Sequence, residues 1–340
     1  MLFSNRSTRM MAFLLFAASL GACSKDDDPA NVEPVDRARS AYIIEDNINF
    51  TICKQVLGFT GQFNLLKSDT SLTFLAPDNE AFMLQQIHMA PHYAFADEWF
   101  HNVARNMILP GIHHLRLMPL GDNQPLHTIT GNNVYVSRYM SGSDTITRVN
   151  GVKVASIDIM AGNGLLQSMT EVVQPERKNN LADMLLSDTS FTLFTQALQH
   201  SGLLGTLREG EYTILAPHND VLRSSGTILP GIDLSTSVNI LEADPAALSA
   251  LMKYHILPGR YFLDGIHRAA NASGNASLIT LNGEAIIVGG DLDSYLSTSF
   301  LGHQNASPAG VYRFWSQQNN MANLPAGNGV VHTINKVLIP

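Results

Sequence analysis

Twelve histidines give this chain its most obvious potential for chemistry, because imidazole binds metal ions and transfers protons near neutral pH. His88 and His92 have the i, i+4 spacing that puts two ligands on one helix face, but Pro91 between them would break that helix. His113 and His114 are adjacent, so their side chains diverge in a helix or a strand. The sequence therefore predicts no metal site, and a metal-assisted hydrolase is the weakest function considered.

Other catalytic signatures are missing from the sequence as well. It contains no Gly-x-Ser-x-Gly elbow for a nucleophilic serine and no phosphate-binding Walker loop. The acidic residues show no evident pair at hydrolase spacing, although a pairing made by the tertiary structure stays open at this point. We therefore expect a protein that is not an enzyme and that uses no cofactor.

The first residues have the anatomy of a secretory signal peptide. Arg6 and Arg9 precede an apolar stretch, 10–20, whose eleven residues are too few to cross a bilayer as a helix. Leu20-Gly21-Ala22-Cys23 resembles the lipobox of bacterial lipoproteins, in which the cysteine is lipidated and becomes the new N-terminus. We therefore expect residues 1–22 to be removed and Cys23 to carry the lipid anchor. A plain signal peptide with a chance cysteine is the alternative.

An acidic run, Ser24-Lys25-Asp26-Asp27-Asp28, follows the predicted lipidation site. It is similar to the tag that sends some Gram-negative lipoproteins to the outer face of the outer membrane; a solvated charge run is the alternative. Residues 23–37 would then form a tether, and the protein would be anchored in the bacterial outer membrane and exposed at the surface. Without residues 1–22 the chain has 19 basic and 29 acidic residues, a net charge of −10 that argues against nucleic acid as a partner.

Comparison of the chain with itself reveals two divergent copies of one module. Residues 72–82 match 212–222 around a shared Ala-Pro, where a short buried strand should end and a helix begin. Residues 162–175 match 327–340, where a glycine turn leads into a β-rich strand. The remaining matches are 46–51 with 187–192 and 108–111 with 256–259, and Asn-Gly hairpin turns are expected at 150–151 and 282–283.

The repeat defines the domain organisation. The offset between copies grows from 140 residues at Ala-Pro to 165 at Gly-Asn-Gly, so the second copy contains insertions, the larger within about 291–326. We expect a first domain over 38–176 and a second over 177–340. Cys53, in the apolar segment 50–57, is expected to be a small core residue.

The order of these motifs resembles the fasciclin (FAS1) module. The match is stronger in the second copy, where Tyr254 and His255 precede Ile-Leu-Pro-Gly, whereas the first copy has Asn106 and Met107. The resemblance implies an α+β fold of two tandem domains, each a twisted antiparallel β-wedge with packed helices. It also implies a binding or scaffold protein. His332 replaces Gln167 of the first copy and is expected to be a tolerated polar position.

The resemblance implies adhesion without catalysis, to envelope components, glycans or neighbouring cells. The expected partners are the membrane, through the lipid anchor, and a protein or polysaccharide of the envelope or matrix. The alternative is an accessory subunit of an outer-membrane uptake or assembly complex. Candidate contact residues are Tyr254 and His255, which could instead fix a turn, and Tyr312 and Trp315 of the insertion, because aromatic rings stack on sugars and anchor interfaces.

Overall fold

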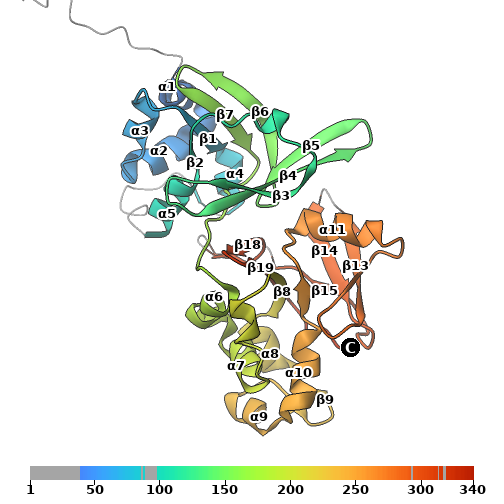
Figure 1. Ribbon diagram of the computed structural model, residues 1–340. Helices are drawn as coiled ribbons and strands as arrows, with labels where there is room; N and C mark the ends of the chain where they lie inside the picture. Colours follow the sequence, from blue (N-terminus) through green and yellow to red (C-terminus); the bar gives the residue numbers. More distant parts are fainter. Residues whose placement is uncertain (1–38, 86, 89–97, 292–293, 313, 317–318) are drawn as a thin grey trace, which may run out of the picture. The chain divides into compact units, whose positions relative to one another are not determined.

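The computed structural model describes residues 39–340 except 86, 89–97, 292–293, 313 and 317–318 (Figure 1). Side chains at 294–296, 314–316 and 319–320 also lie outside the described part. Cys23, the predicted signal peptide and the whole of the predicted tether fall outside the described residues, as does His92. Among the described residues, no helix combines the length and apolar character that a membrane crossing needs.

The first domain has helices on one side of a seven-stranded sheet, with α1, α2 and α3 grouped together (Figure 1). The helices are α1 (Ser40–Asp46), α2 (Thr51–Phe59), α3 (Phe63–Lys67), α4 (Asn79–Met83) and α5 (Glu98–Asn106). The strands are β1 (Leu72–Pro77), β2 (Ile108–Pro110), β3 (Gly121–His127), β4 (Asn133–Ser141), β5 (Asp144–Val149), β6 (Val152–Ala161) and β7 (Gly164–Met169). Their order in the sheet is β2-β1-β7-β6-β5-β4-β3.

The second domain repeats this arrangement with its strands divided between several sheets, in the orders β11-β8-β19-β18 and β12-β13-β14-β15 and the pairs β10-β9 and β16-β17. The helices are α6 (Leu181–Ser187), α7 (Thr192–His200), α8 (Asn219–Ser225), α9 (Ser237–Glu242), α10 (Pro245–Lys253) and α11 (Leu263–Ala272). The strands are β8 (Tyr212–Pro217), β9 (Thr227–Leu229), β10 (Ile232–Asp233), β11 (Ile256–Pro258), β12 (Ser277–Ile279), β13 (Ala285–Asp291), β14 (Ser294–Leu301), β15 (Ala309–Gly310), β16 (Phe314–Ser316), β17 (Asn319–Asn320), β18 (Leu324–Ala326) and β19 (Gly329–Ile334).

Strand direction departs from the sequence-based expectation at one pair in each domain. The antiparallel sheets are confirmed elsewhere, but β1 pairs with β7, and β8 with β19, in parallel. Parallel neighbours need a long crossover connection, and here most of the domain lies between the two strands. The last strand of each module therefore returns to lie beside its first.

Two pairs of equivalent asparagines make the same hydrogen bonds in both domains. Asn79 accepts from the backbone N of Ile52 at 3.0 Å and donates to a carbonyl in the preceding turn, and Asn219 does the same with Leu193 at 3.0 Å. Asn163 and Asn328, which open the final strands, each accept from the first helix of their domain and donate to two carbonyls. These bonds hold together segments that lie far apart in the sequence, so the polar residues of the repeat are structural.

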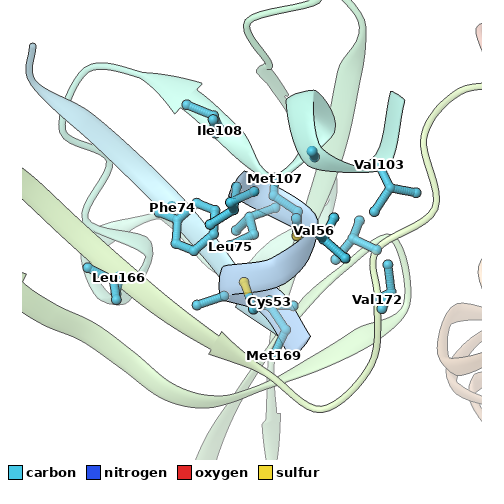
Figure 2. Close-up of a cluster of buried hydrophobic side chains, with 14 of the residues drawn as sticks. Cys53, Val56, Phe74, Leu75, Val103, Met107, Ile108, Leu166, Met169 and Val172 are labelled. Atoms are coloured by element: carbon cyan, nitrogen blue, oxygen red, sulfur yellow. The ribbon is translucent and has the colours of Figure 1, made fainter. Parts of the chain in front are cut away.

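Cys53 lies in the core of the first domain, as the sequence predicts. Its side chain is fully buried on α2, among residues that include Val56, Met107 and Met169 (Figure 2). Burial raises the pKa of the thiol, because a thiolate there would lose its hydration. The group therefore stays protonated and acts as a small apolar side chain.

Candidate binding site

Tyr254 is fully buried at the end of α10. Its hydroxyl donates to the carbonyl of Ala285 at 2.8 Å and accepts from the backbone N of His303 at 3.1 Å. Burial raises the pKa of this phenol, so the hydroxyl keeps its proton. The side chain thus ties β13 and the loop after β14 to the helix end.

His255 is also fully buried and uses both ring nitrogens. Nδ1 lies 2.9 Å from the carbonyl oxygen of Leu251, to which it can only donate, and Nε2 accepts from the backbone N of Leu338 at 3.0 Å. The ring also meets Phe194 edge-on, with centroids 5.8 Å apart. Burial lowers the pKa of His255 to about 4, because a protonated ring would carry uncompensated charge in the core.

These geometries favour the turn-fixing interpretation of Tyr254 and His255. Neither side chain has exposed surface. Tyr254 holds β13 and the loop after β14 against the end of α10, and His255 holds the C-terminal segment there. A contact with a partner through them stays a prediction, and it would require this part of the core to open.

His332 is a second buried imidazole, whereas the sequence predicts a tolerated polar position there. Its Nδ1 accepts from the backbone N of Asn323 at 3.1 Å, and its Nε2 donates to the carbonyl of Tyr261 at 2.9 Å. Burial lowers its pKa to about 4. The surrounding strands could have been expected from the β-rich pattern, but the two backbone partners become visible only in the tertiary structure.

The first domain has no histidine at the positions equivalent to His255 and His332. Gln167 accepts from the backbone N of Asp158 at 2.8 Å, as His332 does from Asn323, and both residues that donate have positive φ, 56° and 52°. Met107 is a buried apolar residue, and Asn106 donates to the carbonyl of Val173 at 3.3 Å. The imidazoles are therefore specific to the second domain.

The predicted insertion, about 291–326, is partly regular structure. β14 pairs antiparallel with β13, and Phe300 in β14 is fully buried. Tyr312 is half-buried, and its backbone N donates to the carbonyl of Thr333 at 2.8 Å. Trp315 belongs to β16, but its side chain lies outside the described residues. The binding role of Tyr312 and Trp315 stays a prediction.

No cluster of three or more His, Cys, Asp or Glu side chains suited to a metal ion occurs in the part of the chain that the structure describes. His88 is exposed, and His113 points its Nε2 at the carbonyl of Pro110, 2.8 Å away. His114 lies 3.7 Å from the Asp158 carboxylate, which is already bonded to the backbone N of Leu115 and Arg116. His113 and His114 thus contact groups of the fold around them, whereas His88 is exposed.

Comparison with known proteins gives the same family twice along the chain. The model of the fasciclin domain matches residues 49–175 and 189–340. The chain is 24% identical over 284 residues to the pig transforming growth factor-beta-induced protein ig-h3, covering 79% of this chain and 35% of the relative. Human periostin is 26% identical over 208 residues, which are 61% of this chain and 21% of periostin. The chain thus spans only about a third or less of these relatives.

A solved structure of a FAS1 domain pair from the insect cell adhesion molecule Fasciclin I is also similar. The superposition covers 88% of this chain and 96% of the solved chain, with 17% sequence identity and a TM-score of 0.41.

Proposed function

Because the chain belongs to the fasciclin family, we propose that it is a non-enzymatic surface protein that binds envelope components, extracellular glycans or neighbouring cells. The observation that carries this proposal is the double family match, since fasciclin domains are modules of adhesion and binding. The match leaves little of residues 49–340 for any other kind of module.

The proposal includes a location, the outer face of a bacterial outer membrane, with Cys23 as the lipid anchor. The lipobox-like residues 20–23 and the acidic run after them support it. Each buried methylene of an acyl chain contributes about 0.8 kcal/mol, so two or three chains anchor a protein durably. In cells fed an alkyne fatty acid, the protein should incorporate the label, and Cys23→Ser should remove it.

Adhesion is tested by comparing cells that carry the protein with cells that lack the gene. The first should bind neighbouring cells or a glycan array, and protease added to intact cells should shave the two domains and abolish binding. Domains that survive shaving but are cut after lysis would rule out surface adhesion. Stoichiometric recovery with an outer-membrane transporter, without glycan or cell binding, would favour the accessory-subunit alternative.

A further inference from the structure

A groove of about 270 Å³ lies in the second domain, between the end of α8 and the segment that follows β19. Helix α8 contributes Val221, Ser224 and Ser225 to its lining, and β9 contributes Thr227 and Ile228. The opposite wall is 335–337 with Ile339. All of these residues are described by the structure.

The equivalent place in the first domain is filled. Gln85, which corresponds to Ser225 at the Ala-Pro offset of 140, is only 2% exposed. Its Nε2 donates to the carbonyl of Val172 at 3.2 Å, and its Oε1 accepts from Gln174 at 3.3 Å. At the offset of 165, Val172 and Gln174 correspond to Val337 and Ile339 of the groove wall. A long amide side chain thus closes this site in the first domain.

The second domain lacks this closing side chain. The Ser225 hydroxyl turns back to the carbonyl of Leu222 at 2.8 Å, and Ile339 stands where the first domain has Gln174. The backbone of the wall is nevertheless satisfied, because Asn305 donates to the carbonyl of Val337 and accepts from the N of Ile339, both at 2.9 Å. The groove therefore exists because the second domain lacks a long side chain at position 225, while the hydrogen bonds of the surrounding backbone are intact.

The lining defines what the groove can receive. Val221, Ile228, Val337 and Ile339 are apolar, Lys336 is the cation, and no carboxylate is among the lining residues. Lys336 is exposed and donates to the hydroxyl of Ser307, a neutral group. The first domain has Glu171 at this position, so the charge is reversed between the copies.

We propose that this groove docks an aliphatic side chain of a protein partner whose neighbouring carboxylate pairs with Lys336. Its volume is below the roughly 300–1,000 Å³ of clefts that enclose small-molecule ligands, and it suits a single anchoring side chain. Charge complementarity selects an acidic neighbour. The inference rests on the proposed binding function and assigns it a surface.

The test uses the mature full-length protein and N-acetyl-leucine, which has an aliphatic side chain beside one carboxylate. Binding is followed by NMR and is expected in the millimolar range for so small a probe. Ser225→Gln, which copies the first domain, should weaken binding at least about tenfold by filling the groove. Lys336→Gln, or the neutral probe N-acetyl-leucine amide, should weaken it about two- to fivefold.

Gln85→Ser is the matched control, because it opens the equivalent place in the first domain, where Glu171 stands instead of Lys336. A carboxylate there repels the acidic probe, so binding should be unchanged. Melting curves of each variant establish that it is folded. Absence of binding by the folded wild type, or equal binding by Ser225→Gln, would overturn the proposal, as would equal binding of the amide and acid probes. Cells that adhere equally well with Ser225→Gln would also refute it while leaving the proposed function intact. Probe binding without adhesion would contradict only the function.

Discussion

The two domains perform the same structural tasks with different side chains, and the difference concerns titratable groups. Where the second domain buries His255 and His332, the first buries Met107 and Gln167. Neither methionine nor glutamine changes charge with pH. One fold thus tolerates both solutions, but only one of them depends on neutral imidazoles in the core.

The second domain should therefore be the acid-sensitive one. The pKa of His255 and of His332 is about 4 in the folded state, against 6.5 for an ordinary histidine. Between these values the unfolded chain binds more protons, so stability falls as the pH drops from about 6.5 to 4. At 1.36 kcal/mol per pKa unit, each histidine contributes a loss of about 3 kcal/mol at pH 4.

Hydrogen exchange read by mass spectrometry at pH 7 and pH 4.5 checks this difference domain by domain. After correction for the intrinsic rate, residues 181–338 should lose protection at the lower pH while residues 41–173 keep more of theirs. Equal loss in both domains would contradict the assignment to the histidines.

A second comparison destabilises one domain at a time by replacing a glycine in its parallel strand pair with alanine. A Cβ at Gly329 would lie 2.0 Å from the carbonyl oxygen of Tyr212, and one at Gly164 would lie 1.8 Å from that of Leu72. Because the parallel strand pair would have to separate, each change to alanine should destabilise its own domain by about 4 kcal/mol or more. Gly58→Ala, which meets no atom within 4 Å, is the control. Thermal unfolding followed by hydrogen exchange should show that each variant destabilises only the domain that contains the substitution. A melting temperature of Gly164→Ala equal to that of the wild type would contradict the close contact between Gly164 and Leu72.

A third comparison places the glutamine that the first domain has at position 167 into the equivalent position of the second domain, 332. In His332→Gln, the amide oxygen can accept from Asn323 as Gln167 does from Asp158, and the amide NH₂ can donate to Tyr261. Stability at pH 7 should change by less than about 1.5 kcal/mol, and about 2.4 kcal/mol of the stability lost between pH 7 and pH 4.5 should be recovered. Urea unfolding at pH 7 and pH 4.5 measures both. An unchanged pH dependence would exclude His332 as a source of the acid sensitivity.

The smallest expected effect concerns the helix caps after Ala-Pro. Asp78 accepts from the backbone N of Ala81 at 2.8 Å, whereas His218 accepts from that of Asp220 through Nδ1 at the longer distance of 3.2 Å. Asp78→Ala should destabilise its domain by about 1 kcal/mol, and His218→Ala by less. Denaturant midpoints of the two variants compare the caps directly, and a larger loss for His218→Ala would reverse the order.

The two Asn-Gly hairpins show which features of the sheet local sequence predicts and which it does not. Asn150-Gly151 and Asn282-Gly283 each join the predicted strands, and the φ of Asn150 and Gly151 is positive, as such a turn requires. The two turns are nevertheless not equivalent. Thr280 bonds Glu284 across the second turn in the way that Thr128 bonds Asn132 in the first domain, so the counterpart of Asn282-Gly283 lies near Gly131. Turn chemistry predicts a hairpin but not its place in the sheet.

The two-module organisation, the strand that ends at each Ala-Pro, and the helix that follows could all be predicted from the amino-acid sequence. These features depend on neighbouring residues: a proline cannot donate to a strand pairing, and a capping side chain starts a helix. The residues within each repeated motif also keep the same order in both copies. The tertiary structure was needed to show that β7 and β19 run parallel to β1 and β8, and that His332 is buried. It also revealed the groove beside Ser225, at the place that Gln85 fills in the first domain. Burial and several hydrogen bonds depend on segments far apart in the chain, such as Gln85 with Val172 at 87 residues and His332 with Tyr261 at 71. No local pattern records which of these segments meet.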